Sequence, residues 1–128
     1  MQQHVLTITQ VKIEENELLL TPIEEWPKDE WLKLKDGERM LADSDALALV
    51  YILELDGQFV QLRFPKHTWP QLHEGYQKGL PAVLEGPENI TLEKFKEELE
   101  YLLDNIEGNG NYGEDMVAAF ENAFQLNK

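Results

Sequence analysis

Two short segments of the sequence carry side chains that could do chemistry, and the first is Asp43-Ser44-Asp45. It places two carboxylates and a hydroxyl close together. Such oxygens suit Mg²⁺ or Ca²⁺, but a metal site would need further ligands from elsewhere in the chain. The alternative is a loop in which the Asp and Ser side chains bond to nearby backbone groups. We favour the loop and keep Asp43 and Asp45 as candidate interaction residues.

The second segment is the Gly- and Asn-rich stretch Asn105–Asp115. Gly, Asn and Asp tolerate positive φ and bond to their own backbone, so the stretch specifies a detailed backbone path. That path either turns a corner between two helices or presents groups to a ligand. We favour the corner, and we keep Asn109, Asn111 and Tyr112 as candidate interaction residues within it.

Two familiar ligand loops do not fit this stretch. If an EF-hand loop began at Asn105, Gly110 would fall at the sharp turn, but Met116 would replace the required bidentate Glu. A start at Glu107 places Tyr112 at the turn position. The stretch also lacks the Gly-Lys-Ser/Thr ending of a phosphate loop. Neither type of loop is therefore predicted.

Other reactive residue types are scarce or poorly spaced. The sequence has no Cys, which excludes disulfides, Cys-based zinc sites and thiol nucleophiles. His4, His67 and His73 lack the i, i+3 or i, i+4 spacing of a metal pair, and we expect them to be solvated surface residues. No Ser lies in a nucleophile elbow. We expect no metal, no cofactor and no catalytic residue, and we lean against an enzyme.

The charge balance narrows the classes of partner. The 128 residues carry a net charge of −14, and residues 1–64 and 65–128 each contribute −7. Such a chain repels phosphate backbones and anionic lipid, so nucleic acid and membrane surfaces are disfavoured as partners and a basic protein surface is favoured. Met1–Val5 has no basic leader pattern, and no apolar run approaches the roughly 18 residues of a spanning helix. We expect a cytoplasmic protein.

The elements that must position these residues begin with two strands. His4–Ile13 alternates like a strand, with a slip near Thr9-Gln10 that suggests a bulge. A turn at residues 14–17 precedes a returning strand, Leu18–Thr21. Residues 23–41 are ambiguous: Pro27 and the acids after it favour a short helical turn over 27–31, and the rest stays undecided.

The clearest element is a hairpin over Ala46–Phe64. Asp56-Gly57 suits a two-residue turn, because such turns need positive φ at both positions. That register places one apolar set on the core face and leaves the other face mixed and partly wet. We predict this hairpin at the centre of the sheet. Its buried residues are Leu49, Tyr51, Leu53, Val60, Leu62 and Phe64.

Helices are predicted in the second half of the chain. The first has Trp69, Leu72 and Tyr76 on one face and ends near Gly79, and a short strand, Pro81–Leu84, follows it. The three tryptophans of the chain either anchor a partner or are core or lid residues of a small domain, and we favour the second role.

Two more helices follow. Thr91 is the predicted cap of the next helix, Gly108 its end, and Asn111 the predicted cap of the last one, with Glu114 three residues later. The helix that follows Thr91 has an apolar stripe formed by Leu92, Phe95, Leu99, Leu102, Leu103 and Ile106. The last helix is predicted to bury Met116, Val117, Phe120 and Phe124.

The predicted order of elements is ββ, ββ, α, β, α, α in a single globular domain spanning residues 1–128. It predicts an α+β fold: a mainly antiparallel sheet of about five strands with helices on one face and two C-terminal helices.

Three segments carry a family resemblance: residues 40–45, residues 50–54 and residues 109–114. Together they resemble an uncharacterised family of small acidic proteins from Bacillus and related Firmicutes, the YjbL-like family. The segment Ile23–Lys35 looks longer and more Trp-rich than is usual there. The resemblance implies a cytoplasmic protein and supplies no activity and no functional residue.

Two functional hypotheses follow. The first is a protein-interaction module with a strongly acidic surface. The second is an enzyme or small-ligand protein with a site near Asp43, Asp45 and the Asn109–Gly113 loop. A deep polar pocket that unites those two segments would favour the second hypothesis, and a flat or convex surface there would favour the first.

Overall fold

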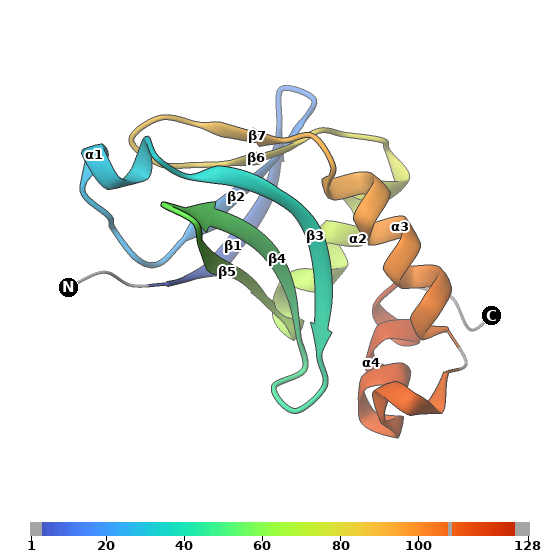
Figure 1. The fold of residues 1–128 in the computed structure, drawn as a ribbon. Helices are drawn as coiled ribbons and strands as arrows, with labels where there is room; N and C mark the ends of the chain where they lie inside the picture. The colour runs from blue at the N-terminus through green and yellow to red at the C-terminus, as the bar shows by residue number, and fades with distance from the viewer. Residues whose placement is uncertain (1–3, 108, 125–128) are drawn as a thin grey trace.

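The computed structural model describes residues 4–107 and 109–124, and its main feature is a strongly curved seven-stranded sheet with helices packed beside it (Figure 1). The strands are β1 (Val5–Glu14), β2 (Glu17–Pro22), β3 (Lys35–Asp43), β4 (Ala48–Leu55), β5 (Gln58–Pro65), β6 (Ala82–Leu84) and β7 (Ile90–Leu92). The helices are α1 (Lys28–Trp31), α2 (Trp69–Gln77), α3 (Phe95–Ile106) and α4 (Glu114–Ala123), with 3₁₀ turns η1 (Lys66–Thr68) and η2 (Gly110–Tyr112).

The sheet is mixed, with the strand order β3-β4-β5-β1-β2-β6-β7. The pairs β1–β2, β3–β4, β4–β5 and β6–β7 are antiparallel, but β1 pairs with β5 and β2 pairs with β6 in parallel. The prediction of a mainly antiparallel sheet of about five strands is therefore wrong. Parallel neighbours are distant in sequence and leave no local turn signal, and strands β3 and β7 were not predicted.

Strand β3 was missed because its sequence is interrupted by a turn signal. Asp36-Gly37 is typical of a hairpin, yet here it lies at an irregularity where the pairing with β4 shifts between Asp36 and Arg39. Gly37 packs so closely that an added Cβ would lie 2.4 Å from the carbonyl oxygen of Ile52. The same dipeptide thus forms a bulge inside a strand.

Strand β7 was missed because its residues were assigned to the following helix. Thr91 pairs with Val83 across the β6–β7 ladder, so its predicted capping role is wrong. Helix α3 begins at Phe95, and its predicted stripe from Phe95 to Ile106 is buried. Leu92 is also buried, but it contributes from the strand.

The β4–β5 hairpin forms in the predicted register. Leu55 pairs with Gln58 and Leu49 with Phe64, and the turn residues Asp56 and Gly57 both have positive φ. All six residues predicted to be buried have no exposed surface. The hairpin is interior but not central, because β1 takes the middle position.

Other local predictions are also confirmed. The pairing of β1 with β2 shifts between Ile8 and Gln10, where the sequence suggested a bulge. The short helical turn predicted over residues 27–31 is helix α1. Helix α2 is followed by Gly79, which has φ +68° as expected for a residue that ends a helix. The tryptophans are core residues: Trp26, Trp31 and Trp69 are all buried.

Two predictions in the helical layer need correction or refinement. His73 is not a solvated surface residue, because its ring packs edge-on against Phe124 and both ring nitrogens are buried. In the last helical segment Met116, Phe120 and Phe124 are buried and Val117 is partly buried. Among the described residues, none of the helices has the length and apolarity that crossing a membrane requires.

Candidate functional site

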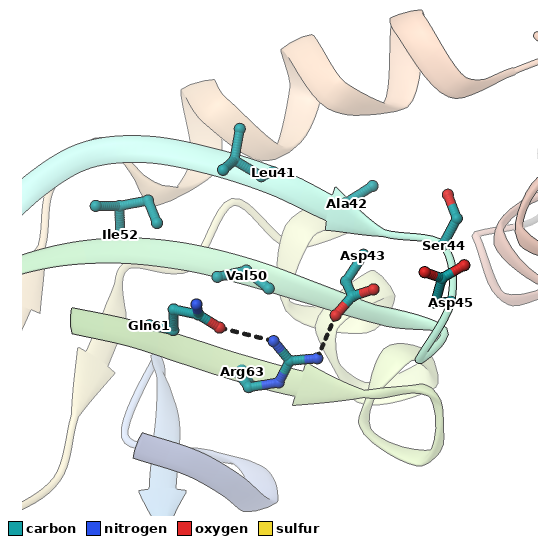
Figure 2. Close-up of a pocket in the computed structure, with 9 residues that line it drawn as sticks. All are labelled: Leu41, Ala42, Asp43, Ser44, Asp45, Val50, Ile52, Gln61 and Arg63. Atoms are coloured by element: carbon teal, nitrogen blue, oxygen red, sulfur yellow. Dashed lines mark hydrogen bonds and ion pairs between the residues drawn. The ribbon is translucent and has the colours of Figure 1, made fainter. Parts of the chain in front are cut away.

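The Asp43-Ser44-Asp45 segment lines a pocket of about 330 Å³ on the outer face of strands β3, β4 and β5 (Figure 2). This face arises from strand alternation: Tyr51 and Leu53 point into the core, so Val50 and Ile52 point the other way. The full lining is Leu41, Ala42, Asp43, Ser44, Asp45, Val50, Ile52, Gln61 and Arg63. We call it the outer-face pocket.

Asp43 has an internal partner in this pocket. One Arg63 nitrogen donates to Asp43 Oδ2 at 2.6 Å, and another donates to Gln61 Oε1 at 2.7 Å (Figure 2). The Ala46 backbone N–H also donates to Asp43, at 3.3 Å. The Arg63 hydrogen bond, followed by the Ala46 bond, lowers the pKa of Asp43 below its ordinary value.

Arg63 was not predicted as a site residue. The hairpin register places it on the outer face, but its contact with Asp43 depends on strand β3, which the sequence did not reveal. Asp45 lies on the same rim and is exposed. The pocket therefore has an apolar floor and a charged rim, an arrangement that suits burial of an apolar side chain better than acid–base chemistry.

The Asn/Gly loop is organised by Asn109. Its Oδ1 accepts from the Asn111 backbone N–H at 3.0 Å, and its Nδ2 donates to the Asn105 carbonyl at 3.1 Å. Helix α4 begins at Glu114 after Gly113, without a side-chain cap. The predicted capping role of Asn111 is therefore wrong, because Asn109 caps the η2 turn instead. The predicted role of Gly108 lies outside the described residues.

Tyr112 is half-buried and lines a different pocket, of about 440 Å³, between β3 and α3. That pocket shares Leu41 and Ala42 with the outer-face pocket. Neither pocket is lined by residues of both candidate segments. Asp43 and Asp45 therefore line one of these two pockets and Tyr112 lines the other. Across the described residues, no three His, Asp or Glu side chains form a group that could hold a metal ion.

A third pocket, of about 380 Å³, was not predicted. It lies where α1 and the segment before it meet the connection between β6 and β7, and its lining residues are Thr21, Pro22, Glu24, Glu25, Trp26, Trp31, Glu85, Gly86 and Pro87. We call it the Trp–Glu pocket. The run Glu24-Glu25-Trp26 was a visible signal, but residues 23–41 were ambiguous and nothing in the sequence placed Glu85 beside them.

Hydrogen bonds hold the walls of the Trp–Glu pocket in place. Thr7 donates its backbone N–H to Glu24 Oε1 at 2.5 Å and its hydroxyl to Glu24 Oε2 at 2.9 Å. The Thr21 hydroxyl donates to Glu85 Oε1 at 2.6 Å. The Trp31 indole donates to the carbonyl of Glu88 at 2.7 Å, which ties α1 to the connection between β6 and β7.

Comparison with known proteins gives a consistent family match. Residues 6–124 match the model of UPF0738, described as a family of unknown function. A UPF0738 protein of Halalkalibacterium halodurans is 45% identical over 120 residues, covering 92% of this chain and 95% of that protein. The UPF0738 protein YjbL of Bacillus subtilis is 45% identical over 91 residues, covering 70% and 75% of the two chains.

A UPF0738 protein of Bacillus mycoides is 37% identical over 123 residues, covering 95% of this chain and 98% of that one. No solved structure matches the chain. These relatives agree with the resemblance noted in the sequence, and their names state no activity.

Proposed function

The chain belongs to the UPF0738 family, whose description assigns no activity, and we propose from its geometry that it works by binding another protein. The contact surface in this proposal is the outer face of strands β3, β4 and β5. The partner carries a basic surface, and the encounter takes place in the cytoplasm.

The observation that carries the proposal is an apolar surface with a polar rim on that face. Val50 and Ile52 form the floor of the outer-face pocket, and Leu41 beside them is 43% exposed. Phe59 lies on the same face, opposite Glu54 in the ladder, and is 65% exposed. Aromatic and apolar anchors surrounded by polar groups are typical of the centre of a protein interface.

Charge supports the choice of a basic partner. The chain carries 25 acidic against 11 basic residues. At the pocket rim, Arg63 is paired with Asp43, and Asp45 is exposed nearby. Complementary charge steers a partner to the surface and fixes its orientation. An acidic partner would meet repulsion from the rest of the chain.

The alternative, an enzyme or small-ligand protein, has less support. Its site required Asp43, Asp45 and the Asn109–Gly113 loop to share a pocket, and the pockets that contain Asp43 and Tyr112 are separate. Asp43 is also engaged with Arg63. We therefore rank binding of a protein above binding of a small molecule.

The test is affinity capture followed by measurement with the purified partner. The tagged protein is used as bait in a Bacillus lysate, the captured protein is identified by mass spectrometry, and binding is measured by calorimetry at low and high salt. We expect Phe59→Ser to weaken binding at least tenfold, since removal of an interface anchor costs about 2 kcal/mol or more. We also expect weaker binding at high salt.

Tyr101→Ser is the matched control. Tyr101 is 68% exposed but belongs to helix α3, and it lines the pocket between β3 and α3, not the outer-face pocket. It should leave the affinity unchanged. The proposal fails if no partner is captured reproducibly, or if Phe59→Ser binds the partner as tightly as the unchanged protein does.

A further inference from the structure

The dipeptide Asn109-Gly110, in the turn between α3 and α4, contains an electrophile and a nucleophile of its own. Asn109 is the one asparagine of the sequence that is followed by Gly. The amide carbon Cγ of an Asn side chain is an electrophile, and the backbone nitrogen of the next residue can close a five-membered ring on it. A following Gly leaves that nitrogen unhindered and lets the backbone rotate. Asn is among the thermally labile residues of proteins.

The surroundings of Gly110 leave room for this ring. Gly110 is exposed, and in the part of the chain that the structure describes a Cβ added to it would meet nothing within 4 Å beyond its chain neighbours. Its φ is not positive, unlike that of Gly113 in the same turn. Neither the backbone conformation nor close packing therefore requires Gly at position 110, but rapid ring closure on Asn109 does.

Hydrogen bonds hold the Asn109 amide away from the reaction in the folded protein. Its Oδ1 accepts from the Asn111 N–H at 3.0 Å, and its Nδ2 donates to the Asn105 carbonyl at 3.1 Å. Asn109 has ψ 97°, which places the Gly110 nitrogen on the side of the Cα–C bond opposite to Cβ. Ring closure therefore requires the η2 turn to open, so that the side-chain bonds break and the backbone rotates. Exposed turns open at low free-energy cost within a native protein.

We propose that Asn109 is a site of spontaneous deamidation and that opening of the η2 turn sets its rate. The Gly110 nitrogen gives its proton to a water-derived base and attacks Cγ. A bond forms between that nitrogen and Cγ, the Cγ–Nδ2 bond breaks, and Nδ2 leaves with a proton as ammonia. Water then adds to one of the two carbonyl carbons of the succinimide ring and opens it to aspartate or isoaspartate. One water is taken up and one ammonia is released.

The product of this reaction cannot rebuild the turn. A carboxylate oxygen replaces the Nδ2 donor and would face the Asn105 carbonyl, which is also an acceptor, near the C-terminal end of α3. The helix dipole places its negative end there, so a new negative charge is unfavourable. Helix α4 follows the turn and packs Phe120 edge-on against Trp69, with ring centroids 5.4 Å apart. Deamidation therefore weakens the attachment of α4, independently of binding at the outer-face pocket.

Peptide mapping by mass spectrometry, during incubation of the protein at pH 8, tests the site. We expect Asn109 to show the mass change from amide to acid before any other asparagine does. In urea-unfolded protein its conversion should be about tenfold faster or more, because no turn has to open. Conversion of another asparagine first, or no conversion of Asn109, would overturn the site. Equal rates in native and unfolded protein would overturn control by the turn.

Gly110→Ala separates the chemistry from the fold. The added Cβ enters open space, so the free energy of unfolding should stay nearly unchanged. The same Cβ hinders the attacking nitrogen, and conversion of Asn109 should slow about tenfold or more in native and unfolded protein alike. Asn111→Ala is the matched control, because it changes the same turn and keeps the Asn109-Gly110 pair. A Gly110→Ala variant that deamidates as fast as the unchanged protein would contradict the proposed attack by the Gly110 nitrogen.

Hydrogen exchange tests the effect on α4. In fully deamidated protein, and in Asn109→Asp, the amide hydrogens of α4 should exchange about threefold faster or more than in fresh protein. Exchange in the β4–β5 hairpin should stay unchanged. Gly110→Ala incubated for the same time should keep the exchange of fresh protein. Unchanged exchange in α4 after deamidation, or equal acceleration in α4 and the hairpin, would overturn the effect on the helix.

Discussion

The side chain of Asp43 is paired with another residue of the same chain, Arg63. Its carboxylate accepts from Arg63 at 2.6 Å and from the Ala46 backbone, and both side chains of the pair are partly shielded from solvent. The Asp-Ser-Asp segment thus links the connection between β3 and β4 to strand β5. It does so by the local bonding that Asp favours in loops, together with one ion pair to a residue twenty positions later.

The Asp43–Arg63 pair makes stability depend on pH in a defined direction. Because its pKa in the folded protein is below the ordinary value of 3.8, the stabilisation is fully present above that value and is lost as the pH falls through the lower, folded-state pKa. We expect Asp43→Asn to cost about 0.2–1 kcal/mol at pH 6. The cost should shrink towards pH 2.5.

Urea unfolding at the two pH values is the measurement. Asp45→Asn is the control, because it removes a neighbouring exposed carboxylate for which the described residues show no ion pair with Arg63. A cost for Asp43→Asn that is the same at both pH values would contradict the role of the ion pair.

At the level of elements, the turn between α3 and α4 is built differently from a simple helix corner. Asn109 bonds backward to Asn105 and forward to Asn111, so a single side chain links the end of α3 to the η2 turn. Gly113 then adopts φ +90°, and α4 starts directly after it. Asn111 is exposed, and its contribution to the turn is through its backbone.

This arrangement predicts unequal effects of two similar substitutions. Asn109→Ala should lose about 0.5–2 kcal/mol of unfolding free energy, because the side-chain acceptor that caps the η2 turn is removed. Asn111→Ala should change it by less than about 0.5 kcal/mol, as is usual for an exposed side chain. The measurement is the unfolding free energy of both variants by chemical denaturation. A larger loss for Asn111→Ala than for Asn109→Ala would show that Asn111, not Asn109, is the capping residue.

At the scale of the whole molecule, two parallel pairings join hairpins that are distant in sequence. β1 lies beside β5, and β2 lies beside β6, so the N-terminal hairpin is inserted between the β4–β5 hairpin and the β6–β7 pair. Helix α1, which precedes β3, lies near the connection between β6 and β7 (Figure 1). The hydrogen bond from the Trp31 indole to the carbonyl of Glu88 ties the two segments together. The Trp–Glu pocket lies where these segments, distant in the sequence, are brought together.

The net charge of −14 acts on the whole molecule. Like charges within one compact chain repel, and salt screens that repulsion. We expect the melting temperature at pH 7 to rise by about 4 °C between 10 and 200 mM NaCl, which corresponds to about 1 kcal/mol for a chain of this size.

The control is the same salt series near pH 4.5, the isoelectric point of the sequence, where the rise should disappear. A flat salt dependence at pH 7 would show that the negative charges are compensated within the fold.

Several local features could be predicted because their signals lie close together in sequence. Asp56-Gly57 sets the register of the β4–β5 hairpin, since a two-residue turn leaves one pairing for every residue on both strands. Helical spacing identified the buried face of α3 in the same way. Three short segments indicated the protein family, because their residues lie next to one another in the sequence.

The tertiary structure alone decided the mixed sheet and the sites. The parallel neighbours of β1 and β2, the contact of Arg63 with Asp43, and the meeting of Glu85 with Trp26 all join residues far apart in the chain. Periodicity and turn signals describe only neighbours in sequence, whereas these contacts depend on how the whole chain buries its apolar surface. For that reason the sequence indicated the β1–β2 and β4–β5 hairpins and the helices, whereas the pairing of distant strands determined which of their side chains meet.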